Sequence, residues 1–372
     1  MNENKISPLN NFVLRTPIYP FNRLDELLRK ESLDDETLKK HFKEKEFQEA
    51  LFYASPSLYY SLNKWLFGKP IHSRKKMMIR RKGLEYLIRM SSRCTTFGLF
   101  TGVATGKWDN ENSVKLNGKV HLEAMYDMEF CASLASWILE DYCFRNKLSF
   151  FSNATIYEAF GELRYIRQST EKNVSKVKVQ SIENNDFLKE ALDFCKNGRR
   201  LGELKEHLLT KARDRDFVNK YIAGLIEHRI IVSELEPNFT GQTYFEKIKR
   251  KAFLLAEEDL KQKVESMSNL DKVLEYIHSD TTGEKKNSIL EATNRVYQEF
   301  PKYNPAKLFH IELYKQFDAC SLNGSQIQLL ENGLECLTKL FPKRQSKYLQ
   351  KFKEEFRYVF GNREIPLMKA LD

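Results

Sequence analysis

Long uninterrupted hydrophobic runs are absent from this sequence of 372 residues. A membrane-spanning helix needs roughly 18 consecutive apolar residues, and charged residues interrupt every apolar run before that length is reached. The opening residues, Met-Asn-Glu-Asn-Lys, are followed by no apolar segment of the kind that serves as a secretory signal. The absence of both features predicts a cytoplasmic protein.

Cysteine is sparse, and its spacing excludes two common structural uses. The six cysteines include no Cys-x-x-Cys pair and lack the density of a disulfide framework, so reduced thiols are expected. The seven histidines show neither the His-x-x-x-His nor the His-Glu-x-x-His spacing of a helical zinc site. We therefore expect no metal centre.

A nucleotide-binding phosphate loop is also missing. Between Thr95 and Trp108 three glycines recur among apolar residues, at Gly98, Gly102 and Gly106. The stretch lacks both the Gly-Lys-Ser/Thr ending of such a loop and a hydrophobic strand before it. It instead predicts a loop followed by a strand in which glycines relieve crowding.

What the chain does have is an excess of positive charge, with 61 Lys and Arg residues against 51 Asp and Glu. The net charge of +10 favours an anionic partner where the cations are concentrated, as they are at 74–93, with Glu85 the only acid. The period of 74–92 is that of an amphipathic helix, which places Arg89 and Arg93 on one face at its C-terminal end. Two guanidiniums there are suited to bind phosphate or carboxylate, and a solvated basic face is the alternative.

The pattern of elements predicts an α+β protein with mixed helical and sheet structure. The length allows roughly two domains of about 100–200 residues. We expect a first part at 1–149, in which 12–17 is strand-like and helical spacing runs from 24 to 92, with Ser55 as an N-cap before Pro56. A mainly helical last part at 237–372 is interrupted by a strand-like run at 308–314.

The middle part, 150–236, has a pattern of its own. Strand-like runs at 154–159, 162–168 and 174–182 precede helical segments at 186–197, 201–212 and 215–228, and a short strand at 230–233 closes the set. These are the ingredients of a winged helix-turn-helix. One interpretation places its last helix in a DNA groove, but that helix mixes acidic and basic residues, which is poor for phosphate contacts. The other, which the mixed charge favours, uses an open sheet edge to accept a peptide as an added strand.

Two further polar positions have both structural and functional interpretations. Asp127 follows a strand-like run at 120–125 and opens an apolar helix, so a plain N-cap is favoured, although a carboxylate there is also able to bind an ammonium or accept a hydroxyl proton. His310 and Glu312 lie two apart on a strand and share a face, which favours a structural polar pair. No Ser-His-Asp or Cys-His set follows from spacing alone.

Four stretches resemble the N-terminal half of lantibiotic dehydratases. They are Phe12-Val-Leu-Arg-Thr-Pro17, Glu49-Ala-Leu-Phe-Tyr-Ala-Ser-Pro-Ser-Leu58, Arg89-Met-Ser-Ser-Arg-Cys-Thr-Thr-Phe-Gly-Leu-Phe-Thr-Gly-Val103 and Leu225-Ile-Glu-His-Arg-Ile-Ile-Val-Ser-Glu-Leu235. The third is the most specific. The resemblance covers essentially the whole chain but only part of the family's length, so we expect part of a longer enzyme or the product of a split gene.

The resemblance implies transfer of glutamate from glutamyl-tRNA to Ser or Thr of a ribosomally made precursor peptide, for later dehydration. The chain would then be part of a tRNA-dependent acyltransferase, with glutamyl-tRNA as co-substrate and no cofactor. These residues do not include the family's elimination domain. Further functional arginines of the family also lie outside them, so this part is expected to be inactive by itself. The alternatives are a leader-peptide-binding module without catalysis and a relative of the peptide aminoacyl-tRNA ligases that adds another amino acid.

The resemblance also implies partners. These are the precursor peptide through its leader, the acceptor end of an aminoacyl-tRNA, a separate elimination protein and other biosynthetic enzymes, and a second copy in a homodimer. Membrane association would be peripheral, through a biosynthetic complex. The middle part, 150–236, is similar to the winged-helix-like element that recognises the leader in this family.

Site residues follow from the match to the family's motifs. Around the tRNA end and the glutamyl group we expect Arg89, Arg93, Thr95, Arg15, Asp127 and Glu312. Contacts with tRNA phosphates are expected from Arg74, Lys75, Lys76, Arg80, Arg81 and Lys82. Leader-peptide contacts are expected from the edge strand formed by Lys176, Val177, Lys178, Val179, Gln180, Ser181 and Ile182. Two residues depart from the family pattern, because Glu312 stands where Asp is usual and Thr96 replaces the Pro of Arg-x-Thr-Pro-Phe-Gly.

Overall fold

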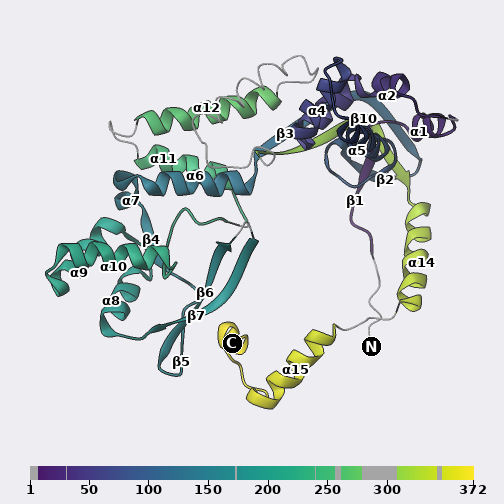
Figure 1. Ribbon diagram of the computed structural model, residues 1–372. Helices are drawn as coiled ribbons and strands as arrows, with labels where there is room; N and C mark the ends of the chain where they lie inside the picture. The colour runs from purple at the N-terminus through teal and green to yellow at the C-terminus, as the bar shows by residue number, and fades with distance from the viewer. Residues whose placement is uncertain are drawn as a thin grey trace. The chain divides into compact units, whose positions relative to one another are not determined.

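The chain forms two compact units (Figure 1). The computed structural model describes residues 7–30, 32–171, 174–238, 240–255, 261–278, 308–341 and 346–372. Unit 1 comprises residues 1–133 and 257–342, and unit 2 comprises residues 134–256 and 343–372. The element expected at 150–236 lies wholly within unit 2, and the domain boundaries proposed from the sequence stay a prediction.

The sheet of unit 1 joins strands from both ends of the sequence. Its order is β1 (Asn11–Pro17), β2 (Gly98–Asp109), β10 (Phe309–Asn323) and β3 (Ser113–Tyr126). β10 runs parallel to β2 and antiparallel to β3, so it separates two strands that are neighbours in sequence. The strands expected at 12–17 and 308–314 are both present, as is the strand expected after the loop at 95–97.

The glycines of β2 relieve crowding, as their spacing predicts. A Cβ atom at Gly106 would overlap the ring of Phe12, which crosses from the paired β1. A Cβ at Gly102 would overlap the side chain of Lys315, which crosses from β10. β2 therefore tolerates bulky neighbours on both sides because it has no side chain at these two points.

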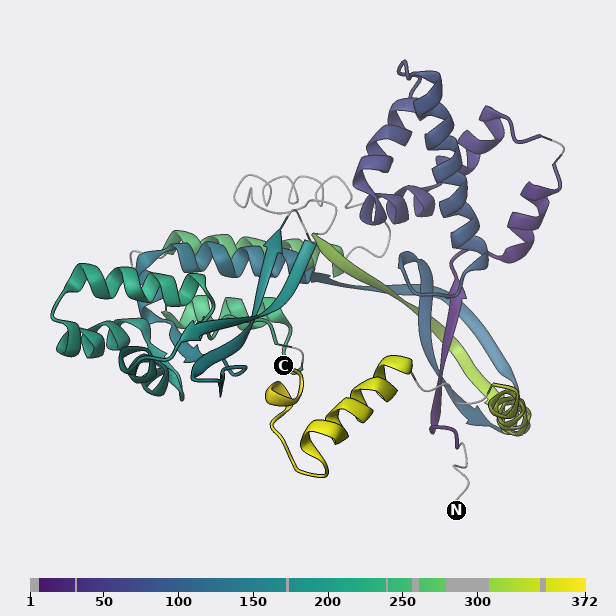
Figure 2. The same cartoon turned by 60° about the horizontal axis from the view of Figure 1, so that its bottom comes forward.

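The N-terminal helices of unit 1 gather at one end of this sheet (Figure 2). They are α1 (Phe21–Leu28), α2 (Asp35–Phe42), α3 (Lys45–Ala54), α4 (Pro56–Leu66) and α5 (Ser73–Ser92). Unit 1 also contains α12 (Lys261–His278) and α14 (Ser325–Leu340), of which α14 follows β10 at the other end of the sheet. Fully buried apolar side chains of α2, α3 and α4, among them Phe42, Phe47 and Leu62, form the core of the cluster. Pro56 takes the first helical position of α4 as expected, but the side chain of Ser55 makes no capping hydrogen bond.

Unit 2 contains short strands and helices in the expected order. α6 (Met128–Glu140) leads into it from unit 1 and is followed by α7 (Tyr142–Lys147), β4 (Ser149–Ser152), β5 (Tyr157–Ala159), β6 (Glu162–Glu171) and β7 (Val174–Glu183). Then come α8 (Asp186–Cys195), β8 (Arg199–Arg200), α9 (Leu201–Ala212), α10 (Arg215–Glu227), β9 (Ile231–Ser233), α11 (Tyr244–Leu255), α15 (Lys347–Phe360) and α16 (Leu367–Ala370).

The strands of unit 2 form two separate sheets, β8-β4-β9 and β5-β6-β7. The closing strand β9 pairs with β4, which the sequence analysis did not identify, and not with the β5–β7 strands. A winged-helix arrangement of this part therefore stays a prediction. In the β5-β6-β7 sheet, β7 lies at the edge and pairs with β6 alone among the described strands.

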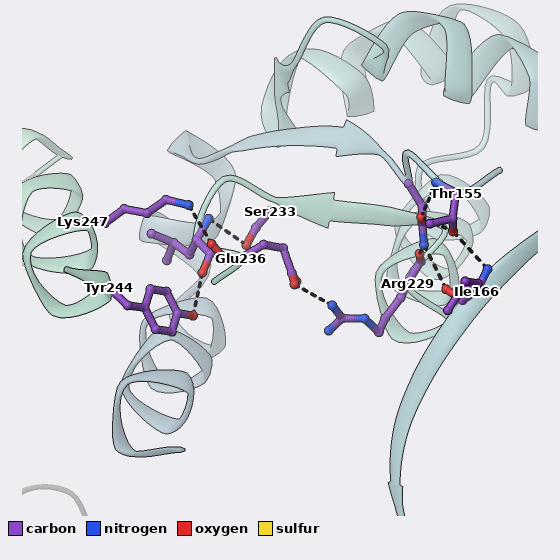
Figure 3. A network of polar contacts seen from close by, with 9 residues as sticks. Thr155, Ile166, Arg229, Ser233, Glu236, Tyr244 and Lys247 are labelled. Carbon is purple, nitrogen blue, oxygen red and sulfur yellow. Dashed lines mark hydrogen bonds and ion pairs between the residues drawn. The ribbon is translucent and has the colours of Figure 1, made fainter. Parts of the chain in front are cut away.

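A polar network holds the β5-β6-β7 sheet to the end of α10 (Figure 3). The Asn153 side chain donates hydrogen bonds to the carbonyls of Arg229, at 2.8 Å, and of Ile166, at 3.3 Å. Thr155 Oγ1 accepts from the backbone N–H of Ile166 at 3.0 Å. Because Ile166 belongs to β6 and Arg229 follows α10, the edge strand is part of a braced framework.

The same network continues toward α11. The guanidinium of Arg229, a residue with φ of 58°, donates to Glu236 at 2.6 Å, and the Glu236 carbonyl accepts from Lys247 at 2.6 Å. Burial lowers the pKa of Lys247. Tyr244 in α11 donates to the Leu235 carbonyl at 2.7 Å. The turn after β9 is thus bonded from both sides.

Among the described helices, none has the length and apolar character needed to cross a membrane.

Candidate active site

Arg89 and Arg93 lie at the C-terminal end of α5, as their spacing predicts. The Arg89 guanidinium stacks over the ring of Phe97 with 4.4 Å to the ring centre, and its Nε is buried with no hydrogen-bond partner among the described residues. Arg93 is exposed, caps α5, and accepts a hydrogen bond at its carbonyl from Thr101 Oγ1 at 2.9 Å. The helix end and the start of β2 are therefore held together, and Thr95 is exposed in the loop between them.

A pocket of about 220 Å³ opens beside this junction. Its walls come from the end of α3, the loop and first half of β2, and residues 309–313 of β10. The pairing of β10 with β2 shifts register between Glu312 opposite Gly98 and Leu313 opposite Gly102, and the pocket lies at this irregularity. Phe97 lines the pocket and its ring carries the Arg89 guanidinium, while Arg89 itself is not among the described residues that line the pocket.

Glu312 lies in the pocket wall, with its side chain partly exposed. Its carboxylate accepts a hydrogen bond from the Tyr314 hydroxyl at 3.0 Å and is 3.3 Å from His310 Nε2. The hydrogen bond to Glu312 is the main cause that raises the pKa of Tyr314 to about 12, so the phenol stays a donor. The polar pair predicted from the spacing of His310 and Glu312 is present.

Asp127 is an N-cap, as the structural interpretation favoured. Its Oδ1 accepts from the backbone N–H of Glu129 at 2.8 Å in the first turn of α6. Its own backbone N–H donates to the carbonyl of Leu308 at 3.0 Å, directly before the β10 residues that line the pocket. The carboxylate is therefore fixed near the start of the pocket wall.

Arg15 is exposed on β1, opposite Val103 of β2, which lines the pocket. The next residue, Thr16, accepts a hydrogen bond from Lys315 of β10. Phe97 contacts Arg89, Tyr314 contacts Glu312, and Lys315 bonds to Thr16, the neighbour of Arg15; the sequence analysis selected none of the three. Proximity in the chain to Thr95 and Glu312 was their signal in the sequence, and only the contact of Lys315 joins distant segments, 299 residues apart.

The basic residues of α5 are not equivalent. Lys76 and Arg80 pair with Asp35 of α2, and Arg80 also donates to the carbonyl of Leu33. Arg81 and Lys82 share Glu85 at 3.0 and 2.7 Å. Arg74 and Lys75 are exposed near the start of the helix, and no ion pair to a described residue is formed by either. The expectation that Glu85 alone opposes these cations missed Asp35, which reaches them from another helix.

The strand expected to bind a leader peptide is β7, described above as an edge strand. Val177 and Val179 share one face and are 64% and 46% exposed, so the edge presents apolar as well as main-chain groups. The residue types Lys-Val-Lys-Val-Gln-Ser-Ile alternate along it. Within the described ranges, no group of three or more His, Cys, Asp or Glu side chains is arranged to hold a metal ion.

The chain belongs to the family described as lantibiotic dehydratase, N terminus, because residues 43–372 match it. Among curated relatives, the chain is 21% identical to the epidermin biosynthesis protein EpiB of Staphylococcus epidermidis over 374 residues, which cover 99% of this chain and 37% of EpiB. It is 24% identical to the subtilin biosynthesis protein SpaB of Bacillus subtilis over 245 residues, 64% of this chain and 23% of SpaB. The resemblance inferred from the four motifs is confirmed.

The chain is also similar in fold to solved structures. The tRNA-dependent lantibiotic dehydratase MibB of Microbispora sp. 107891 superposes with a TM-score of 0.79 at 19% identity, covering 98% of this chain and 34% of MibB. The glutamylation domain TbtB of thiomuracin biosynthesis, bound to 5'-phosphodesmethylglutamycin, gives a TM-score of 0.60 at 13% identity, covering 90% and 41%. The mixed α+β fold is confirmed, and the chain spans little more than a third of the length of EpiB or MibB.

Proposed function

We propose that this chain carries the glutamyl-transfer part of a lantibiotic dehydratase. It would move glutamate from glutamyl-tRNA to Ser or Thr hydroxyls of a ribosomally made precursor peptide. The observation that carries the proposal is the buried Nε of Arg89, which has no hydrogen-bond partner among the described residues; its guanidinium stacks on Phe97, which lines a pocket that also presents the Glu312 carboxylate. A buried donor without a partner is costly and is satisfied when an anionic ligand binds.

The chemistry requires positioning more than activation. Aminoacyl-tRNA is already an ester, so the peptide hydroxyl attacks its carbonyl carbon, a new ester forms, and the tRNA ribose oxygen leaves and takes up a proton. Arg89 and Arg93 would neutralise the anionic groups of the glutamyl-tRNA terminus by bidentate hydrogen bonds. Glu312 would attract the α-ammonium of the amino acid. Holding ester and hydroxyl together supplies most of the rate enhancement that such a site needs.

The partners would reach this site by separate surfaces. Arg74 and Lys75 of α5 are exposed and form no ion pair with a described residue, which suits them to tRNA phosphates, and Arg15, Thr95 and Asp127 would complete the site around the acceptor end. The precursor peptide would add its leader as a strand to the edge of β7. A separate elimination protein would then remove glutamate from the modified residue.

A second candidate is a ligase-type relative that adds a different amino acid to a peptide. The residues lining the pocket include no lysine or arginine within the described part of the chain, so the pocket interior offers no cation to a glutamate side chain. An apolar side chain would suit the lining of Tyr53, Phe309 and Ile311. Transfer assays with glutamyl-tRNA and with other aminoacyl-tRNAs distinguish the two.

The test uses a short Ser-, Thr- and Cys-rich precursor peptide with its leader as acceptor. The double variant Arg89→Glu/Arg93→Glu should lose transfer of radiolabelled glutamate while leaving leader binding unchanged, because the arginines lie in unit 1 and β7 lies in unit 2. The control is Lys353→Glu/Arg357→Glu, the same charge reversal at two exposed cations that are likewise four apart, on α15, and it should transfer normally. Undiminished transfer by the first variant would refute the assignment.

A reciprocal variant separates the enzyme from a binding module without catalysis. Val177→Asp/Val179→Asp should weaken leader binding about tenfold or more, because it removes apolar contacts along the edge strand. Its control is Val114→Asp, an exposed valine of β3 in unit 1. Leader binding without any transfer by the wild-type chain would favour the binding module.

A further inference from the structure

Lys315 is a lysine whose side chain points across the sheet of unit 1 and not into solvent. It lies on β10, and its Nζ donates to Thr16 Oγ1 at 2.9 Å and to the carbonyl of Pro17 at 2.6 Å. Thr16 and Pro17 belong to β1, which is separated from β10 by β2. One side chain therefore spans three strands and joins positions 299 residues apart.

The strand that this side chain crosses leaves space for it. A Cβ atom at Gly102 of β2 would overlap Lys315 Cγ and stand 2.8 Å from its Cδ, so the lysine can cross only where β2 has a glycine. Leu313 occupies the rest of this space, since its Cδ2 would lie 2.7 Å from that Cβ. The glycine and the lysine are thus complementary in shape.

The ammonium lies in a partly buried setting near the loop that carries Arg93 and Thr95. Burial lowers the pKa of Lys315, and the nearby Cys94 opposes this effect. The loop begins at Arg93, whose carbonyl accepts a hydrogen bond from Thr101, the neighbour of the Gly102 that the Lys315 side chain crosses. Lys315 of β10, the strand of Glu312, therefore bonds to β1, the strand of Arg15, beside the anchor of this loop.

We propose that Lys315 is a positioning residue that fastens β1 to β10 and so holds Arg15 beside the pocket. β1 is an edge strand with a single pairing partner among the described strands, and its ladder runs to Pro17 opposite Thr101. The two hydrogen bonds from the charged donor of Lys315 add a tie from this end of β1 to β10, with which β1 does not pair. The link to catalysis rests on the proposed glutamyl transfer, whereas the fastening of β1 does not.

The fastening is tested by hydrogen–deuterium exchange of residues 11–17. In Lys315→Met, exchange of these amides should rise by about tenfold or more, since two bonds to one ammonium are lost. Lys107→Met, an exposed lysine on the neighbouring β2, is the matched control and should exchange like wild type. Wild-type exchange rates in Lys315→Met would overturn the proposal.

A milder variant guards against loss of the fold. Thr16→Val removes one of the two acceptors and should raise exchange by a smaller factor. The double variant Thr16→Val/Lys315→Met should exchange no faster than Lys315→Met, because both act through one contact. Additive effects of the two substitutions would contradict a shared contact.

The link to transfer is tested separately. In Lys315→Met, kcat should fall about tenfold to a hundredfold with little change in the peptide KM, and the loss should vanish in an Arg15→Ala background. If Lys315→Met exchanged faster but kept a normal kcat, the link between β1 and β10 would be supported and its role in transfer would be refuted. Absence of transfer by the wild-type chain would overturn the proposed function, and the exchange measurements would still decide the fastening.

Discussion

Two helical glycines of unit 1 have opposite surroundings. In α5, a Cβ at Gly83 would stand 2.6 Å from Cζ of Phe42, which is fully buried and stacked on Phe47 with ring centres 5.2 Å apart. In α14, a Cβ at Gly333 would meet nothing within 4 Å. The first glycine allows close packing of α5 on α2, and the second only weakens its helix.

We therefore expect Gly83→Ala and Gly333→Ala to change stability in opposite directions. Gly83→Ala should lower the free energy of unfolding by about 1–3 kcal/mol, because Phe42 has no room to move. Gly333→Ala should raise it by roughly 0.5–1 kcal/mol through helix propensity. Urea denaturation measures both free energies of unfolding. If Gly83→Ala stabilised the protein, the close packing of Gly83 against Phe42 would be contradicted.

The hydrogen bond between Tyr314 and Glu312 has a consequence at alkaline pH. The folded-state pKa of Tyr314 is raised from 10.0 to about 12, so the folded protein holds this proton more tightly than the unfolded chain does. The stability from this group is complete below pH 10 and is lost as pH rises from 10 to about 12. The phenolate difference spectrum between wild type and Tyr314→Phe should show one tyrosine titrating well above pH 10. A midpoint near pH 10 would contradict the bond to Glu312.

At the scale of the element, the cations along α5 differ in whether they are already paired with carboxylates. Its first turn carries exposed cations, its middle cations are paired with Asp35 and Glu85, and its last turn carries Arg89 beside Phe97. Pairing matters because a cation already neutralised by a carboxylate releases fewer counterions from bound RNA. A basic run in the sequence is therefore only partly available to a polyanion.

This division predicts the salt dependence of tRNA binding. Arg74→Ala/Lys75→Ala should reduce the slope of log affinity against log salt by roughly 1.4–1.8, about 0.7–0.9 for each phosphate contact. Arg81→Ala/Lys82→Ala should change it less, because Glu85 pairs with both cations. Fluorescence anisotropy with labelled tRNA over a range of salt measures the slopes. A larger effect of the second pair would contradict the assignment.

At the scale of the whole molecule, two units with separate cores make up one chain. Unit 1 has the α2–α4 cluster at one end of its sheet, and unit 2 has its own buried set, which includes Leu188, Leu204 and Ile222 from three successive helices. Units with separate cores commonly unfold in separate steps.

We expect calorimetry to resolve two transitions that respond to different substitutions. Leu188→Ala, at a fully buried position of α8, should destabilise unit 2 by about 2–5 kcal/mol and shift one transition. Gly83→Ala should shift the other. A single transition shifted by both variants would show that the units unfold together.

Much of the local structure was determined by the sequence alone. The periodicities of 174–182, 186–197, 201–212 and 215–228 correspond to β7, α8, α9 and α10, since period and capping depend on neighbours in the chain. The motif at 89–103 indicated the family, and the spacing of Arg89 and Arg93 placed both at the end of one helix. The polar pair of His310 and Glu312 followed from alternation on a strand.

The tertiary structure decided what distant segments do to one another. Insertion of β10 between β2 and β3, the pairing of Asp35 with Lys76 and Arg80, and the reach of Lys315 to Thr16 each join segments that sequence spacing does not relate. Periodicity reports which face of an element is apolar, but not which element will cover it. Packing and chain topology determine which element covers it. They bring Gly102 and Lys315, which no sequence motif singled out together, into contact beside the candidate site.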